Sequence, residues 1–546
     1  MRRSHRLTAI ATSSVLALVA VMLVAPCASA QLNQPLHRDG WILAAAHAPG
    51  LHGSIWRTDL WLYADTLGGH EVSLKLCRSG QDNTAAQTFT VTAAPGQMVV
   101  SIEDVVDHFL SLGGGSWVGA IHYTANVPLQ AWARVYSISA DGSASYGQLV
   151  EGIPTEQMSP SWMDGFNTDH MQYVYAAKHT ADGRFRVNVG VVNPTATECD
   201  YRVEMYDATR NNPSSGPASV DVTVPPYSMV QLADPFAFVT GGEWHDHLIQ
   251  LLCDTRGGGG FMYASAVDNA TNDAYFVRGV KDLSASSGAG LNAPLHRDGW
   301  LLAAARAPGL HGSIWRTDLW FNVTAPWGSN HVSLTFCRSG EDNSDAQTFE
   351  LPLTDDQRTY YVEDAVESFL HVGDDPWVGA IHYSASGDVQ VWARIYSISA
   401  DGSASYGQLV EGIPTSDMSI AFQTPGFPGT EEDQWMFAGK HTAGGRFRVN
   451  VGLVNPTSVG GRFWVAMFDA FGERDSIVEV QLEPYSMVQL ADPFAAVDDG
   501  DWSEKQIRVE AEAEGSGAFG YISVVDNATN DAYFVRGIKT MEFPAP

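Results

Sequence analysis

The feature that most constrains this fold is a duplication that covers almost the whole chain. The stretch LHRDGWILAAAHAPGLHGSIWRTDLW begins at Leu36 and returns nearly unchanged at Leu295. The stretch SISADGSASYGQLVEGIPT begins at Ser137 and is repeated letter for letter from Ser397. Because sequences this similar adopt the same structure, the chain must fold as two equivalent halves in tandem.

Each half contains a second, fainter repeat. RTDLWLY, from Arg57, aligns with RVNVGVV, from Arg186, and DGSASYGQLVEG, from Asp141, aligns with DNATNDAYFVRG, from Asp268. The offset of about 128 residues indicates four units in the order A-B-A-B. The chain then divides into a signal peptide at 1–30, unit A1 at 31–160, unit B1 at 161–283, a Ser/Gly-rich linker at 284–290, unit A2 at 291–420 and unit B2 at 421–546.

Apolar and polar residues alternate through these units. In WRTDLWLY, which starts at Trp56, one face carries Trp56, Leu60 and Leu62, and FRVNVGV at 185–191 alternates in the same way. Alternation with a period of two indicates strands with one buried face. Helical periodicity is limited to 103–110 and 363–370. The pattern predicts an all-β protein made of four tandem β-sandwich units, broadly immunoglobulin-like.

The first thirty residues have the pattern of an export signal. Arg2, Arg3 and Arg6 precede an apolar run, and Ala28-Ser29-Ala30 provides a small-residue cleavage site. No later apolar run reaches the roughly 20 residues that a membrane-spanning helix needs. We therefore expect a secreted or cell-surface protein without a transmembrane segment after cleavage of the signal.

The chain is strongly acidic. Its formal net charge is −31, and the predicted signal peptide carries three arginines and no acidic residue, so the mature chain is more negative still. Phosphate backbones are bound by positive surfaces. The charge argues against nucleic acid as a partner and is typical of a soluble, weakly self-associating protein.

The cysteines can be compared between the copies. Cys199 and Cys253 both lie in B1, and their counterparts in B2 are Gly461 and Ala511. The joint loss of both residues predicts a disulfide between Cys199 and Cys253, which export would favour. Cys77 and its A2 counterpart Cys337 stand at the outward face of a strand. They could pair with each other, pair between molecules or remain free.

Catalytic motifs are absent from the sequence. It has no GxSxG, HExxH, P-loop or EF-hand pattern. Several histidines recur in both copies, and Asp39 or Asp59 could orient one of them in a catalytic pair. Near-identical copies repeat every residue, however, so recurrence alone does not identify a catalytic group. The recurring histidines are His37/His296, His52/His311, His122/His382 and His179/His441.

An arginine recurs in all four units, followed two residues later by Asp or Asn. Residues i and i+2 share a strand face, so this pair predicts an internal polar clamp, within the strand or to a neighbouring strand. Trp61 and Trp320 stand on the same face in the A units only. A tryptophan beside an arginine is a candidate binding platform for sugars or peptides, unless a B unit covers it. The arginines are Arg57, Arg186, Arg316 and Arg448.

The repeated stretch VDNATNDAYFVRG, at 267–279 and 525–537, crowds oxygen-bearing side chains together. Such crowding suggests a calcium loop confined to the B units. The alignment with DGSASYGQLVEG favours a different interpretation, a hairpin turn that closes each unit. The candidate ligands are Asp268, Asn269 and Asp273, with their copies Asp526, Asn527 and Asp531.

WRTDLWL, the Asn193-Pro194 turn and the closing VDNxTxD hairpin together resemble poorly characterised repeat modules of secreted bacterial proteins. The resemblance implies export and β-sandwich units, and no activity. The sequence thus predicts a non-catalytic extracellular or cell-surface protein, a structural or adhesion-like binding module whose partner is an extracellular protein or a glycan. It predicts no cofactor, apart from the calcium alternative. The alternatives are carbohydrate binding through the A-unit Trp face, with Arg57, Trp61, Arg316 and Trp320, and a secreted hydrolase with an unfamiliar site.

Overall fold

The computed structural model describes residues 36–539, except 51–52, 67, 166–170, 208–216, 282–294, 324–330, 355–356, 421–432, 496–499 and 513–514. The expected signal peptide at 1–30 and linker at 284–290 lie outside the described residues. The described chain consists of antiparallel strands in four units, as the sequence predicts. Two short helices, α2 (Val105–Leu110) and α3 (Ala365–Leu370), lie where helical periodicity predicts them.

Each A unit is one strongly bent sheet built around a single long strand. The first half of β6 pairs with β1 and β3, and its second half pairs with β2 and β7. The strands of A1 are β1 (His37–Pro49), β2 (Ile55–Tyr63), β3 (His70–Arg78), β4 (Thr88–Ala93), β5 (Val99–Ile102), β6 (Trp117–Ile138), β7 (Ser145–Glu151) and β8 (Ile153–Pro154). Those of A2 are β19 (His296–Pro308), β20 (Ile314–Val323), β21 (His331–Arg338), β22 (Thr348–Pro352), β23 (Thr359–Val362), β24 (Trp377–Ile398), β25 (Ser405–Glu411) and β26 (Ile413–Pro414).

Each B unit is a sandwich of two sheets. In B1 the orders are β13-β12-β15-β10-β18 and β14-β11-β16-β17, with β9 beside β16. The strands of B1 are β9 (Ser159–Pro160), β10 (Met171–Val174), β11 (Phe185–Asn193), β12 (Cys199–Tyr206), β13 (Ala218–Val224), β14 (Ser228–Leu232), β15 (Leu248–Cys253), β16 (Gly259–Asp268), β17 (Ala274–Arg278) and β18 (Val280–Lys281). Those of B2 are β27 (Ser419–Ile420), β28 (Gln434–Met436), β29 (Phe447–Val454), β30 (Gly461–Phe468), β31 (Arg474–Leu482), β32 (Met487–Leu490), β33 (Gln506–Ala511), β34 (Gly517–Asp526), β35 (Asp531–Arg536) and β36 (Ile538–Lys539).

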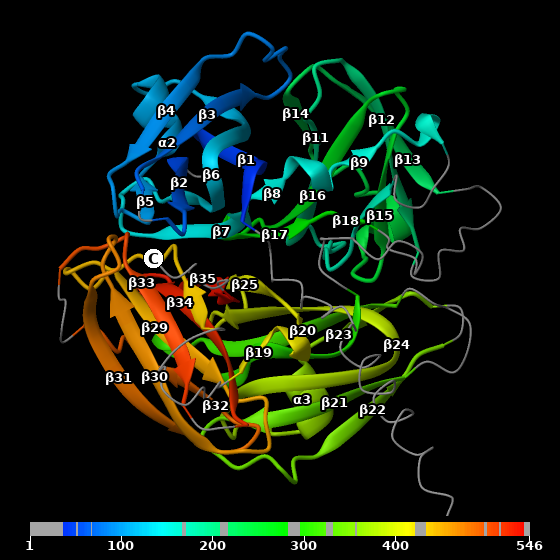
Figure 1. Ribbon diagram of the computed structural model, residues 1–546. Helices are drawn as coiled ribbons and strands as arrows, with labels where there is room; N and C mark the ends of the chain where they lie inside the picture. Colours follow the sequence, from blue (N-terminus) through cyan, green and yellow to red (C-terminus); the bar gives the residue numbers. More distant parts are fainter. Residues whose placement is uncertain are drawn as a thin grey trace, which may run out of the picture.

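The four hydrophobic cores are continuous, because each of them includes side chains from another unit. The A1 core includes Phe261 and Phe276 of B1, and the A2 core includes Phe519 and Phe534 of B2. The two halves also share cores, because A1 side chains enter the B2 core and A2 side chains enter the B1 core. In Figure 1, A1 stands above B2, and B1 stands above A2. The units therefore form one packed body rather than a flexible string.

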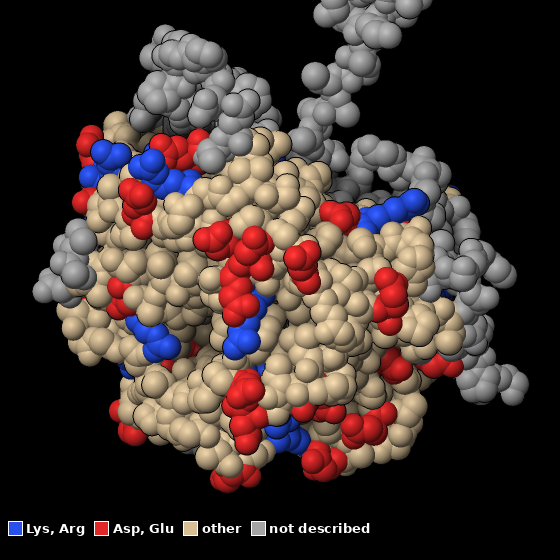
Figure 2. Space-filling view, turned by 90° about the horizontal axis from the view of Figure 1, so that it is seen from below, with Lys and Arg blue, Asp and Glu red and all other residues tan. Residues whose placement is uncertain are grey.

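The surface reflects the acidic composition. On the face shown in Figure 2, acidic side chains are spread widely, and lysines and arginines lie singly or in small groups, many of them beside acidic residues. Among the described residues, no helix combines the length and the apolar character required to cross a bilayer.

Candidate functional site: the junction of the four units

The two A-unit tryptophans that the sequence singled out lie in the contact between the halves. Trp61 is 2% exposed, and its indole Nε1 donates a hydrogen bond to the carbonyl oxygen of Ser503 in B2 at 2.8 Å. Trp320 is fully buried and donates in the same way to the carbonyl oxygen of His245 in B1 at 2.7 Å. Each tryptophan of the candidate binding platform is therefore covered by the B unit of the other half.

The arginines on the same strand face pair with an aspartate outside their own strand, and not with the aspartate two residues later. Arg57 Nε lies 3.5 Å from Asp104 Oδ2, and Arg316 Nε lies 3.4 Å from Asp364 Oδ2. Asp59, two residues after Arg57, accepts a hydrogen bond from the Tyr136 hydroxyl on the neighbouring strand. The polar clamp thus connects neighbouring elements instead of joining the arginine and aspartate of one strand.

Lysines of the B units complete these clusters from the opposite half. Lys440 Nζ of B2 lies 3.0 Å from Asp59 Oδ2 and 2.8 Å from Glu103 Oε1 of A1. The equivalent Lys178 of B1 lies 3.6 Å from Asp318 and 3.4 Å from Glu363 of A2. Each half therefore supplies the cation for a buried carboxylate of the other.

The closing stretch VDNATNDAYFVRG forms a hairpin, as the repeat alignment favours. In B1 it runs from the end of β16 through β17, and the Asp268 backbone N–H donates to the carbonyl oxygen of Asp273 at 2.8 Å. Asn269 Nδ2 donates to Gly183 O, and its copy Asn527 donates to Gly445 O, both at 2.7 Å. The amide nitrogen of each asparagine is thus bonded within its own B unit.

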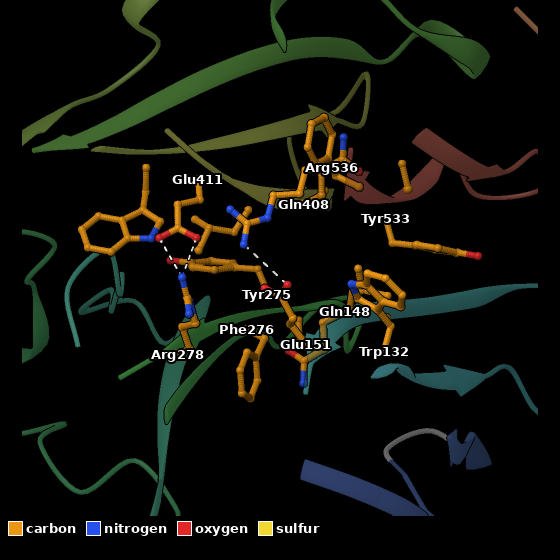
Figure 3. Close-up of a pocket in the computed structure, with 18 residues that line it drawn as sticks. Trp132, Gln148, Glu151, Tyr275, Phe276, Arg278, Gln408, Glu411, Tyr533 and Arg536 are labelled. Carbon is orange, nitrogen blue, oxygen red and sulfur yellow. Dashed lines mark hydrogen bonds and ion pairs between the residues drawn. The ribbon is translucent and has the colours of Figure 1, made fainter. Parts of the chain in front are cut away.

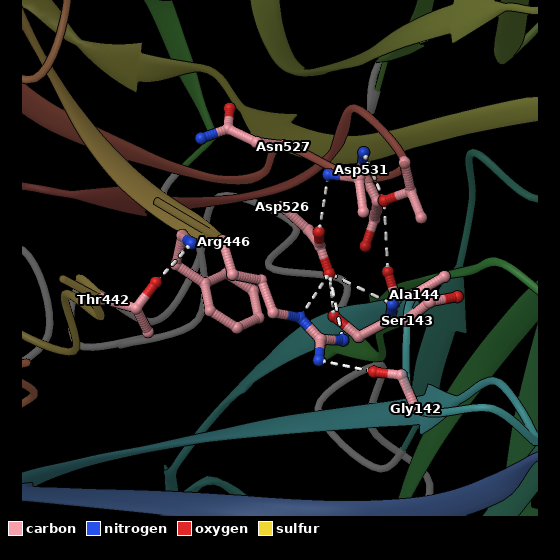
Figure 4. Close-up of polar contacts among 12 residues, drawn as sticks. Gly142, Ser143, Ala144, Thr442, Arg446, Asp526, Asn527 and Asp531 are labelled. Atoms are coloured by element: carbon pink, nitrogen blue, oxygen red, sulfur yellow. Dashed lines mark hydrogen bonds and ion pairs between the residues drawn. The ribbon is translucent and has the colours of Figure 1, made fainter. Parts of the chain in front are cut away.

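The carboxylates of these hairpins bind the opposite half. Asp526 Oδ2 accepts hydrogen bonds from Ser145 N at 3.1 Å and Ser145 Oγ at 2.7 Å, and it lies 3.4 Å from Arg446 Nε. Arg446 Nη1 also donates to Gly142 O of A1 at 2.7 Å (Figure 4). Asp268 makes the matching contacts with Ser405 of A2 and with Arg184.

Asp273 and Asp531 continue this arrangement deeper in the junction. Asp531 Oδ2 accepts from Gly147 N, and Asp273 Oδ2 accepts from Gly407 N, both at 3.0 Å. Burial raises the pKa of Asp531 to about 7, although Arg134 at 3.7 Å opposes the shift. Burial also raises the pKa of Asp273, and the Asp531 charge adds to that rise. Across the residues that the structure describes, no group of three or more His, Cys, Asp or Glu side chains is arranged to hold a metal ion.

A pocket lies at the centre of the junction, and all four units contribute to its wall (Figure 3). It has a volume of about 120 Å³. Its lining includes six pairs of equivalent residues, one member of each pair from either half. These pairs are Trp132/Trp392, Gln148/Gln408, Glu151/Glu411, Tyr275/Tyr533, Phe276/Phe534 and Arg278/Arg536. The sequence patterns did not point to this site, although the residues of β7 and β25 stand within the unchanged repeat SISADGSASYGQLVEGIPT.

The recurring histidines lie in separate places. His122 Nε2 is 3.2 Å from Asp39 in A1, and His382 Nε2 is 2.9 Å from Asp298 in A2. His179 of B1 pairs with Asp234 at 3.1 Å. None of these histidines lines the central pocket. His52 lies outside the described residues.

The cysteines fall into two kinds. Cys199 and Cys253 lie on the neighbouring strands β12 and β15, and both sulfur atoms approach Gly258. The structure records them as free thiols, so the predicted disulfide is not formed in it. A hydrogen bond from Cys253 lowers the pKa of the Cys199 thiol to about 5.

Cys77 and Cys337 were expected on an outward strand face, and this prediction is wrong. Each thiol is buried in the core of its own A unit. Burial raises the pKa of both thiols to about 12.

Comparison with known proteins gives little further guidance. No family model matches the chain, and no curated protein matches it. Among solved structures, one described as "Biofilm associated protein - BSP domain" aligns over 93% of this chain and 97% of its own, at 9% identity and a TM-score of 0.14. At that TM-score the alignment carries no argument about function.

Proposed function

We propose that this chain is an exported, non-catalytic extracellular or cell-surface binding protein whose binding site is the central pocket. The observation that carries the proposal is the pocket itself, whose wall is assembled from all four units, which pack against one another through contacts between the halves. Binding sites for small molecules are typically preformed concave surfaces with aromatic walls and a few polar groups. The export signal predicted at 1–30 supports an extracellular location.

The placement of the reactive side chains supports the non-catalytic part of the proposal. The histidine–aspartate pairs stand apart from the pocket, each within its own unit. The buried carboxylates of the closing hairpins are engaged by backbone N–H groups and serines of the opposite half. A catalytic site needs such groups together around one substrate position.

The test is to express the chain from Met1 in a bacterial host and to screen the purified protein against small-molecule libraries by thermal shift. We expect the protein in the medium or envelope fraction, and at least one compound that stabilises it without being converted. The double variant His122→Ala/His382→Ala should bind that compound as the unmodified protein does. Retention in the cytoplasm, or turnover of the compound that disappears in the double variant, would overturn the proposal.

A further inference from the structure

The contact between half 1 (A1 and B1) and half 2 (A2 and B2) is made twice, with the roles of the halves exchanged. Arg446 Nη1 of B2 donates to Gly142 O of A1 at 2.7 Å (Figure 4). Its counterpart Arg184 of B1 donates to Gly402 O of A2 at the same distance. The closing hairpins repeat this reciprocity through their aspartates. Each half therefore carries both sides of the contact.

These contacts do not depend on the covalent connection between the halves. They are made by strands and turns within the units, whereas the halves are joined through the segment 282–294, which contains the Ser/Gly-rich stretch 284–290. Ser/Gly-rich joints keep two domains near each other at an effective concentration on the order of 1 mM, without fixing which copy of the partner domain is bound. Half 2 of a second molecule presents the same surface to half 1 as half 2 of its own molecule.

Where the two halves differ in sequence, the differences match across the contact. Ser101 of A1 meets Ser503 of B2, with the hydroxyl oxygens 2.7 Å apart. At the equivalent position on the other side, Tyr361 of A2 packs on His245 of B1, with the ring centroids 4.3 Å apart. Two copies of the same half would set a serine against a ring and keep neither contact. The side chains therefore favour pairing of half 1 with half 2.

We infer that the contact between the halves is also a docking surface for a second copy of this chain. Two molecules exchange halves, so that half 1 of each packs against half 2 of the other in a closed two-fold dimer. The dimer has two central pockets, and in each of them Arg278 of one molecule pairs with Glu411 of the other. This inference concerns assembly and goes beyond the proposed binding function.

Protein concentration decides between the single molecule and the exchanged dimer, because both contain the same contacts. Folding at low concentration favours the partner half on the same chain. As the protein concentration approaches the effective concentration set by the joint, the partner half of a second molecule competes for the surface. Once formed, the dimer should persist on dilution, because its separation exposes the buried Trp61 and Trp320.

The experiment uses the full chain with a protease site inserted at 284–290, prepared in one form with natural nitrogen and one form with heavy nitrogen. Equal amounts of the light and heavy forms are unfolded together and refolded at roughly 5 µM and roughly 200 µM, both below the effective concentration of the joint. Size exclusion with light scattering should find a dimer that persists on dilution. Its fraction should rise about tenfold between the two concentrations, since dimer formation competes with pairing inside one molecule.

The isolated dimer is then cut at the protease site and weighed by native mass spectrometry. An exchanged dimer should separate into particles of the original mass, many of which combine a light half 1 with a heavy half 2 or the reverse. Light and heavy proteins that are refolded and cut separately before mixing are the control and should give no such hybrids.

Three results would overturn the inference. The first is the absence of a dimer at the higher concentration. The second is a dimer that yields only all-light and all-heavy particles after the cut, because another surface would then hold it together. The third is a set of particles that contain two copies of the same half, which native mass spectrometry distinguishes because the halves differ in sequence and mass.

Discussion

Tyr146 of A1 stacks on Tyr406 of A2, with the ring centroids 5.5 Å apart and the ring planes inclined by 16°. These two residues are equivalent in the duplication, and a contact between equivalent residues lies on a two-fold axis. Several other contacts between the halves occur in pairs about this axis, as for Lys440 with Asp59 and Lys178 with Asp318. The two halves of one chain therefore meet as the two subunits of a symmetric dimer would.

The buried tryptophans should contribute strongly to the stability of this contact. Trp61→Ala and Trp320→Ala each remove a buried aromatic ring and a hydrogen bond between the halves, and each should lower the free energy of unfolding by about 3–5 kcal/mol. Trp464→Ala, at a partly exposed position of β30, should cost much less. Chemical denaturation followed by fluorescence measures all three. Equal losses for Trp61 and Trp464 would show that the contact between the halves is weak.

The pKa of Asp531 gives the stability a pH dependence. The native carboxyl keeps its proton up to about pH 7, whereas an unfolded aspartate releases it near pH 4. Between these values the native state binds more protons, so the stability contributed by the protonated carboxyl is lost as the pH rises. The charged groups that face it are Asp526 of its own unit and, from the opposite half, Arg134 and Asp273.

Asp531→Asn keeps an acceptor for Gly147 N and removes the titration. We expect the free energy of unfolding of the unmodified protein to fall between about pH 5 and about pH 8 by on the order of 2–4 kcal/mol more than that of the variant. Urea denaturation at both pH values measures the difference. Parallel pH profiles for the two proteins would mean that this carboxyl is already ionised at low pH.

The Cys199 and Cys253 thiols should oxidise to a disulfide in an exported protein. They lie on neighbouring strands, and the lowered pKa of Cys199 favours the reactive thiolate. A bridge closing a loop of about 55 residues stabilises by roughly 4 kcal/mol in the chain-entropy model. Mass spectrometry without reductant should find this pair linked, with Cys77 and Cys337 as unmodified thiols. Detection of free Cys199 and Cys253 after air oxidation would exclude the bridge.

Calcium should not stabilise the protein. Two of the candidate ligands, Asp268 and Asp526, already accept hydrogen bonds from serines of the opposite half. A titration with calcium at neutral pH should leave the melting temperature unchanged within about one degree, since a ligand that binds only the native state raises it. A rise of several degrees that is lost in Asp526→Asn would restore the calcium site.

The sequence predicts the individual units well because their pattern is local. Alternation in WRTDLWLY places Leu60 and Leu62 in the A1 core, and the alignment of the closing stretches identifies both hairpins. The packing of the two halves joins residues that are far apart in the sequence, and the alternation of apolar and polar residues does not indicate which faces meet. Trp61 therefore looks like part of a surface platform in the sequence, although B2 covers it.

The same limit explains the site residues that the sequence patterns did not reveal. Gln408 and Arg278 lie in different units and come together only when the halves close around the two-fold axis. The stretches DGSASYGQLVEG and VDNATNDAYFVRG align as equivalents, yet in the structure each contacts the other across the halves. Each stretch recurs letter for letter in the other half, and this identity is the signal that could have indicated a shared interface.

The most direct test of the account is to insert a protease site into the linker at 284–290 and to cut the folded protein there. Because the halves bury reciprocal aromatic and ionic contacts, the cut protein should elute from size exclusion as one particle of the original mass, and should split into halves only in denaturant. Elution as two separate half-size species under native conditions would contradict the claim that the four units form a single body around the central pocket.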